Sequence, residues 1–457
     1  MVALECFKNL QIIVDYTEST WKASATKRFA TALRYPDRVC GIAVRRPEKG
    51  SDNLKISKAL DLPFPALESL VVDNTRAGPS IILPTSLTTS IQSLRHLQLI
   101  NTRLTSLFPL LPVTGTLVDL NLNIDTIYYT TNGGSLLAHL QHMPHLCNLQ
   151  VTTQLYCWRP TVEKPPPTTV LLAELTSIRL SGPNSQTEWF LAGLVTPSLR
   201  ELHISAFDRD YRSSRGFDIP CLSKFIRVAG MCFFAARLAL SPSSLMSRIA
   251  LFAPSHSVDA PSQVVTINTP LSAEMGSAFS AMLAILEDIF LSFSANRTPY
   301  GSLLGDLAPW RKFFGHFCNV KVLRLHHGLE MEVAFMLWQP SVNPPPPQED
   351  IDPDTMTTPI NSSRSQYIFP SLEQIVVYPR TPDASIGTEE RASALEPFGL
   401  FKAARHQMGR PVKVSWNTDG EIPVCSLTEP AGYMMHPIMH PMTETAGHMV
   451  HPMDLLI

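Results

Sequence analysis

The chain has 457 residues, of which 44% are hydrophobic and only 17% are charged, against about 25% charged residues in an average soluble protein. The 37 basic and 39 acidic side chains leave a formal net charge of −2, which argues against a polycationic nucleic-acid-binding protein and against an acidic tail. Thirty-nine prolines would interrupt the helices of a large all-helical bundle, so that class is excluded as well.

The eight cysteines are scattered singly along the chain. No C-x-x-C pair occurs, which excludes a zinc ribbon or finger, and scattered thiols are typical of an intracellular protein, cytoplasmic or nuclear. The start, MVALECFKNLQIIVDY, lacks the basic segment and the apolar run of a signal peptide. The most apolar stretch, 275–293, contains Glu287 and Asp288, so it is predicted to be a buried amphipathic helix and not a membrane span.

A short apolar pattern recurs along the chain: an apolar residue, two variable residues, a second apolar residue, one variable residue and a third apolar residue. Copies start at 67, 94, 117, 146, 175 and 199, which are 27, 23, 29, 29 and 24 residues apart, a spacing typical of leucine-rich repeats. The second and third apolar residues share one face of a strand and should pack inward. Weaker copies begin at Phe7, Val39, Ala235, Val320 and Leu372.

Helices are predicted between these strands. Segments 135–142 and 188–195 have helical character and precede Pro144 and Pro197, which end a helix before the next strand. Longer helices are predicted at 21–33 and 274–293 from their apolar spacing. A helix around 398–406 and a strand at 412–416 would close the array.

The predicted fold is an α/β leucine-rich-repeat-like solenoid over residues 1–420, with parallel strands on the concave face, short helices on the convex face and irregular repeats. A proline-rich loop at 159–169 and a disordered proline-rich insertion at 339–366 interrupt it. Residues 421–457 are predicted to be a disordered Met/His-rich tail, in which TEPAGYMMHP recurs 15 residues later as TETAGHMVHP.

The combination of FPxLExLxV, SLRxLxL, short helices ending at proline and drifting repeat length resembles the repeat region of fungal F-box proteins with leucine-rich-like repeats. The resemblance covers residues 1–420 and implies a non-catalytic protein-interaction solenoid, the substrate-recognition part of a cullin–RING (SCF) ubiquitin ligase. No Leu-Pro-x-Glu-type F-box stretch occurs before residue 60. Binding to the adaptor of the ligase is therefore expected only if an F-box is present upstream.

The resemblance is incomplete at one repeat position. Regular leucine-rich repeats place Asn where this chain has Thr75, Thr102, Asp125, Gln154, Pro183 and Phe207. An asparagine ladder is therefore not expected.

Residues that alternate with the inward pairs are expected to line the concave face and bind a protein partner. The selected residues are Asn121, Asn123, Gln150, Arg179, His203, Arg237, Arg324 and His326. The three arginines occupy the same place in their repeats, so they are predicted to form a positive row over the second half of the face. Such a row would recruit an acidic or phosphorylated protein segment. The alternative is that each arginine pairs with a nearby carboxylate, such as Glu201.

Other functions stay open at this point. The chain contains no GxxxxGK[ST], GxGxxG, GxSxG or HExxH motif, so no catalytic, cofactor-binding or metal-binding residue is assigned and the protein is predicted not to be an enzyme. A free-standing repeat scaffold or truncated paralogue with no ubiquitin-ligase role is the main alternative.

A metal-binding protein is a minor alternative. His139, His142 and His145 stand three apart, and the tail carries His436, His440, His448 and His451 among methionines, a ligand set that suits Cu(I). A polar helix edge and a duplicated unstructured segment explain the same residues without a metal.

Overall fold

A computed structural model describes most of the repeat region. The chain divides into two units, Met1–Gly420 and Glu421–Ile457, and all described residues belong to the first. They are residues 11–17, 29–45, 56–74, 83–84, 87, 91–101, 115–124, 133–153, 169–207, 220–231, 233, 235–240, 247–252, 264–269, 276, 279–280, 282–293, 308–326, 328–338, 368–378 and 387–417. The predictions for the loop 159–168, the insertion 339–366 and the tail 421–457 lie outside these residues.

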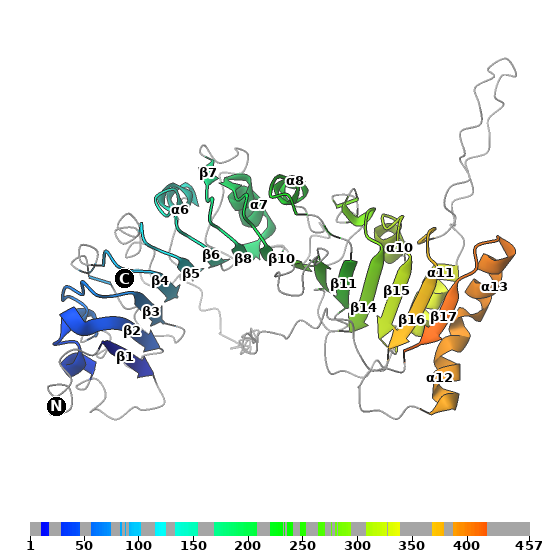
Figure 1. Ribbon diagram of the computed structural model, residues 1–457, viewed down its shortest axis with the longest axis horizontal. Helices are drawn as coiled ribbons and strands as arrows, with labels where there is room; N and C mark the ends of the chain where they lie inside the picture. The colour runs from blue at the N-terminus through cyan, green and yellow to red at the C-terminus, as the bar shows by residue number, and fades with distance from the viewer. Residues whose placement is uncertain are drawn as a thin grey trace, which may run out of the picture. The chain divides into compact units, whose positions relative to one another are not determined.

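One fifteen-stranded sheet dominates the described part of the chain (Figure 1). Its order is β1-β2-β3-β4-β5-β6-β8-β10-β13-β12-β11-β14-β15-β16-β17, and β7 pairs with β9 in a separate two-stranded sheet. The strands are β1 (Ile12–Thr17), β2 (Val39–Arg45), β3 (Ser69–Asp73), β4 (His96–Ile100), β5 (Asp119–Ile124), β6 (Asn148–Thr153), β7 (Val170–Leu171), β8 (Ser177–Pro183), β9 (Leu194–Val195), β10 (Glu201–Phe207), β11 (Ala235–Leu240), β12 (Ser247–Phe252), β13 (Val264–Thr269), β14 (Asp288–Phe293), β15 (Val322–His326), β16 (Gln374–Tyr378) and β17 (Lys413–Trp416).

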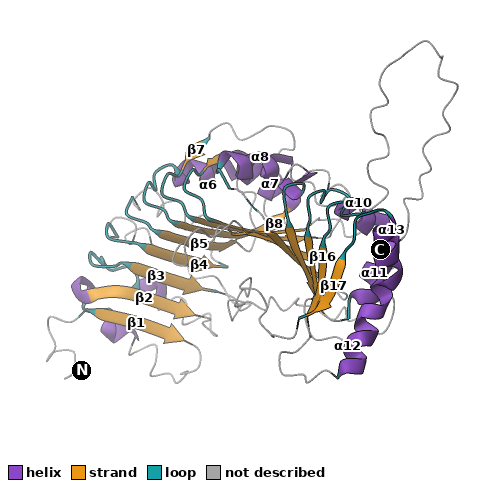
Figure 2. Ribbon diagram, turned by 45° about the vertical axis from the view of Figure 1, so that its right-hand side comes forward, coloured by secondary structure: helices purple, strands orange, loops and turns teal. Residues whose placement is uncertain are grey.

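The helices are short. They are η2 (Pro36–Arg38), α6 (Gly133–Leu140), α7 (Asn184–Ala192), α8 (Pro220–Val228), α10 (Ala308–Phe314), α11 (Glu330–Trp338), α12 (Thr388–Leu395), η4 (Glu396–Phe398) and α13 (Gly399–Gln407). Figure 2 shows α6, α7, α8 and α10 on one side of the sheet. None of the helices in the described ranges has the length and apolar character that a bilayer crossing requires.

The repeat pattern explains the core. In β5, Leu120 and Leu122 are 2% and 1% exposed, and the first apolar residue of that repeat, Leu117, is fully buried. The corresponding residues of β3, β4, β6, β8 and β10 are buried in the same way and belong to one core cluster. Since one strand cannot cover its own apolar face, stacking of neighbours makes the core continuous. The fold is thus α/β, with parallel strands and short helices, and is compatible with a solenoid.

The predicted array of parallel strands is interrupted after β10, where the strand order also departs from the order along the chain. There, β13 pairs with β10 in parallel, β12 pairs with β13 and β11 in antiparallel fashion, and β11 pairs with β14 in parallel. The strands β12 and β13, SRIALF and VVTINT, were not predicted, because neither carries the repeat pattern. Antiparallel neighbours need only short connections, so the segment from β11 to β13 enters the sheet as a meander in reverse order.

The predicted helix 274–293 is wrong at its C-terminal end. Residues Asp288–Phe293 form β14, and the turn before it begins at 284. Leu286, Ile289 and Leu291 have the spacing of the repeat and are all buried, so this segment is a copy of the repeat that the helical periodicity concealed. Buried strands and buried helices are both continuously apolar, which makes such runs ambiguous.

For the weak copy at Phe7, the sequence predicted the wrong residues as the inward pair of the strand. The register of β1 with β2 pairs Val14 with Ile42 and Tyr16 with Val44, so Val14 and Tyr16 are the inward pair and both are buried. Of the other weak copies, those in β2, β15 and β16 have the predicted phase. The copy at Ala235 is shifted by two residues, since the register of β11 with β14 pairs Ala236 with Ile289 and Leu238 with Leu291. The closing helix and strand predicted near 398–406 and 412–416 are present as α13 and β17.

The contact between β6 and β8 requires a glycine. A Cβ at Gly182 would lie 2.1 Å from Oγ1 of Thr153 on the neighbouring strand, and that hydroxyl donates to Oε1 of Gln186 at 2.9 Å. We expect Gly182→Ala to lower the free energy of unfolding by about 1–3 kcal/mol, as overpacking does elsewhere. Chemical denaturation measures the loss.

The matched control for this prediction removes the obstructing oxygen. In a double-mutant cycle, Thr153→Ala should recover part of the loss caused by Gly182→Ala, since the Thr153 Cβ itself would lie 3.4 Å from the new methyl group. Additive effects of the two substitutions would show that the strands do not approach as closely as described.

Candidate binding face

The register of the sheet arranges its outward residues in rows. We call the face of the sheet opposite α6–α8 the strand face; it carries the residues that alternate with the core residues. Over β3, β4, β5, β6, β8 and β10, two neighbouring rows on this face are polar. The anchored row contains Ser69, His96, Asp119, Asn148, Ser177 and Glu201, and the amide row contains Val71, Gln98, Asn121, Gln150, Arg179 and His203.

These two rows line a hollow of about 460 Å³. Its lining includes the whole anchored row and the amide row from Val71 to Arg179. Of the residues selected from the sequence, Asn121, Gln150 and Arg179 therefore lie together in one depression. His203 follows Arg179 in the same row, whereas Asn123 belongs to the next row along β5.

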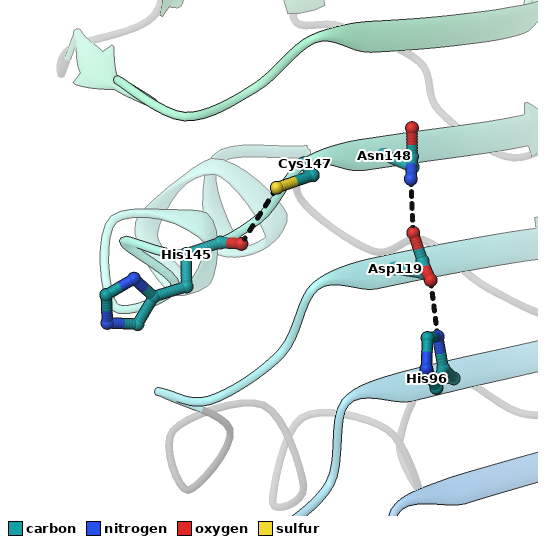
Figure 3. Close-up of polar contacts among 5 residues, drawn as sticks. All are labelled: His96, Asp119, His145, Cys147 and Asn148. Atoms are coloured by element: carbon teal, nitrogen blue, oxygen red, sulfur yellow. Dashed lines mark hydrogen bonds and ion pairs between the residues drawn. The ribbon is translucent and has the colours of Figure 1, made fainter.

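Side chains of the anchored row hold one another in place. The carboxylate of Asp119 contacts Nδ1 of His96 and accepts a hydrogen bond from the side-chain amide of Asn148 (Figure 3). The three residues come from three adjacent strands, so the contacts run along the row. Because both oxygens of Asp119 are engaged, the hydrogen-bonding capacity of this carboxylate is largely satisfied within the protein.

Glu201 ends the anchored row in a similar way. Its Oε2 accepts a hydrogen bond from the hydroxyl of Ser177 at 3.2 Å and lies 3.9 Å from Nε2 of His203. The contact with His203 lowers the pKa of Glu201 most, and Ser177 and the charge of Arg179 lower it further, although burial acts in the opposite direction. The carboxylate is therefore ionised at neutral pH.

Four side chains of the amide row have no hydrogen-bond partner in the described part of the chain. Gln98, Asn121 and Gln150 are half-buried and Arg179 is exposed. Within the described ranges, no hydrogen bond or ion pair is found for the side chains of these four residues, apart from the longer-range attraction between Arg179 and Glu201. The hollow thus combines a fixed polar row with a row whose donors and acceptors face solvent.

The second half of the strand face is not the open basic surface that the sequence suggested. Arg324 donates from Nε to both oxygens of Asp288 at 2.8 and 3.0 Å, and from Nη1 to the hydroxyl of Tyr378 at 2.6 Å. Phe290 is 6% exposed and Tyr378 is 3% exposed, and the ring of Phe290 meets His326 and Tyr378 edge to face. Arg324 and His326 are therefore parts of a packed aromatic and ion-pair cluster.

Burial and ion pairing both shift the pKa values of Asp288 and Arg324 in this cluster. Burial raises the pKa of Asp288, and the attraction of Arg324 only partly offsets this effect. Burial alone would lower the pKa of Arg324, but Asp288 and Tyr378 together raise it. The two residues differ in their partners: Asp288 and Tyr378 both stabilise the charged form of Arg324, whereas Arg324 alone stabilises that of Asp288.

The three selected arginines do fall in one register row. From Arg179 the row passes through His203, Thr266 and Ala250 to Arg237, and then through Phe290 to Arg324. At about 4.8 Å per strand, Arg179 and Arg237 are roughly 19 Å apart, because β10, β13 and β12 lie between their strands. Only the backbone of Arg237 is described. The sequence could not show this separation, since it depends on the reversed meander.

Three neighbours in the anchored row are of the residue types found in a catalytic triad: a nucleophile (Ser69), a base (His96) and an orienting acid (Asp119). Among the described residues, no hydrogen bond joins Ser69 to His96. The backbone N–H groups of β3, β4 and β5 point into the ladders on either side, which leaves no pair of donors for an oxyanion. In the described residues, these three side chains therefore lack both the hydrogen bond between nucleophile and base and the oxyanion-binding donors that acyl transfer requires.

Cys147, just before β6, is held as a thiol. Burial raises its pKa, and the carboxylates of Glu174 and Asp119 raise it further. Its Sγ donates to the backbone carbonyl oxygen of His145 at 3.5 Å (Figure 3). A nucleophilic cysteine needs the opposite environment, one that favours the thiolate.

Metal ligation finds no support in the part of the chain that the structure describes. No group of three or more His, Cys, Asp or Glu residues is arranged there to hold an ion. Burial lowers the pKa of His139, with a further contribution from His142, and His145 turns to Glu174 at 3.2 Å. The histidines of the tail lie outside the described residues.

Reasoning from the sequence assigned the anchored row to the concave face, but it neither selected these residues for binding nor predicted their contacts with one another. Strand alternation places His96, Asp119, Asn148, Ser177 and Glu201 on the same face as the selected residues, so the signal was available. Nothing in the spacing along the chain distinguishes them, because their contacts link residues 23 to 29 positions apart. Compared with protein-family models and with curated proteins, the chain matches none, so the face itself carries the argument about function.

Proposed function

We propose that this protein is a non-catalytic, leucine-rich-repeat-like solenoid that binds another protein on its strand face. By the resemblance of its repeats, we further propose that it holds the substrate of a cullin–RING ubiquitin ligase. The observation that carries the binding proposal is the hollow over β3–β10, in which a row of unsatisfied amide and guanidinium groups faces solvent beside a fixed polar row.

Two physical arguments support binding over catalysis. A surface group that has no partner within the protein can exchange its water for a partner without breaking an internal contact. In contrast, a catalytic centre needs donors arranged for a developing charge, and the ladder between β3 and β5 uses the backbone groups that would supply them.

Site-specific photo-crosslinking tests this proposal. A photoreactive side chain in place of Gln98, which lines the hollow, is expected to crosslink a discrete set of proteins in cells. The matched control replaces Gln141, an exposed glutamine that follows α6 on the helix side. We expect the crosslinks at 98 to be absent at 141 and to be lost when Asn121 and Gln150 are both changed to Leu.

The result that would contradict the proposal is equal crosslinking at 98 and 141, or crosslinks at 98 that survive the double substitution. Either outcome would move the binding surface away from the strand face. The ligase assignment is tested separately, by asking whether a captured protein accumulates and loses its ubiquitin chains when the gene is removed.

A further inference from the structure

The amide row has a geometry that suits a peptide backbone. Gln98, Asn121 and Gln150 occupy one register row on three adjacent strands, so their attachment points are about 4.8 Å apart. Each carboxamide offers donors and an acceptor, as does each peptide group of a ligand. An extended peptide that lies along the row could therefore form backbone hydrogen bonds with all three side chains, whatever the sequence of the peptide.

The next residue in the row adds a charge preference. Arg179 pairs with Gln150 in the register and is exposed. The two carboxylates of the hollow, Asp119 and Glu201, already accept hydrogen bonds from Asn148 and Ser177. In the described lining of the hollow, Arg179 is thus the cation whose donors have no acceptor within hydrogen-bond distance, and a guanidinium binds carboxylates through paired hydrogen bonds.

Resting on the proposed function, we infer that the strand face binds an extended segment of a partner protein that carries an aspartate or glutamate opposite Arg179. From Gln98 to Arg179 the row covers three strand steps, roughly 14 Å, which an extended peptide spans with four to five residues. The row continues past Arg179 to His203, so the segment passes across the arginine and presents a side-chain carboxylate to it. A single cation is too little for nucleic acid, which is held by many phosphate contacts.

A peptide library tests this inference with the purified full-length chain. We would screen random twelve-residue peptides that are acetylated at the N-terminus and amidated at the C-terminus, so that only side chains supply carboxylates. The expected result is enrichment of peptides that share one Asp or Glu position. A fluorescent copy of an enriched peptide then serves as the probe in anisotropy titrations.

Substitutions in the row should change the affinity for this probe. Arg179→Glu is expected to weaken binding by about tenfold or more, as for loss of a charge-assisted contact. Replacing the shared acidic residue of the peptide by Lys should restore binding to that variant. Asn121→Leu should weaken binding roughly fivefold, whereas the control Gln141→Leu should leave the affinity unchanged. Thermal melts establish that each variant is folded.

Three results would overturn the inference: no enrichment of peptides, enrichment without a shared acidic position, or an unchanged affinity for Arg179→Glu. Failure of this inference can be distinguished from failure of the proposed function. If the crosslinks at Gln98 are found but the library gives no acidic peptide, the strand face still binds a protein, and the partner is not an extended acidic segment.

Discussion

Leu120→Asp is expected to abolish the cooperative thermal unfolding transition of the native protein. Leu120 is 2% exposed and packs between the inward residues of β4 and β6. Shortening a buried leucine costs about 2–5 kcal/mol, and a buried unpaired carboxylate adds several kcal/mol more. The sum is comparable with the whole stability of a typical domain, which is about 5–15 kcal/mol. Circular dichroism during heating provides the measurement.

Asn121→Asp is the matched control, since it adds the same side chain one position further along β5. Asn121 lies on the opposite face and lines the hollow, so the new carboxylate stays in water. Surface changes of this kind usually alter stability by no more than about 0.5 kcal/mol. Equal melting temperatures for the two variants would mean that the strand register is wrong by one residue.

Arg405→Met is expected to loosen α13 from the sheet. Arg405 is 2% exposed; its Nη2 donates to the carbonyl oxygen of Leu372 at 2.8 Å, and both Nη atoms donate to that of Pro370 at 3.3 Å. Hydrogen bonds to a charged group contribute roughly 1.5–3 kcal/mol each, and methionine recovers part of this by filling the space. With a net loss of about 2 kcal/mol, amide hydrogen exchange in α13 should become roughly thirtyfold faster.

Arg410→Met controls for the loss of an arginine near the same loop. Arg410 is exposed and its Nη1 reaches the same carbonyl oxygen of Pro370 at 3.4 Å. Because water can replace this contact, exchange in α13 should stay as in the native protein. Similar acceleration in both variants would show that the buried contacts of Arg405 do not fasten the helix.

The sequence predicted much of the fold because its signal is local. Within each repeat, the inward residues are two or three positions apart, so a pattern such as Leu117, Leu120 and Leu122 fixes both the strand and the buried face. Where the local signal is ambiguous, the prediction failed. The run 288–293 is apolar enough for a helix or a strand, and only its pairing with β11 and β15 makes it β14.

The candidate site was predicted in part. The structure places Asn121, Gln150 and Arg179 side by side in one row, because consecutive repeats bring equivalent positions together. Their role in binding stays a prediction. The contacts of His96, Asp119 and Glu201 were not predicted, because hydrogen bonds along the anchored row join residues whose separation in sequence carries no pattern.

By itself, the sequence determined the strands, the buried face and the spacing of the six repeats that start between residues 67 and 199, because these follow from the alternation of side chains within a few residues. Only the tertiary structure decided which strands are neighbours and which charges are paired. The meander β11–β13 separates Arg179 from Arg237, and Asp288 engages Arg324 across β14 and β15. Strand order and ion pairing depend on contacts between residues far apart in the chain, and these arise only when the whole sheet assembles.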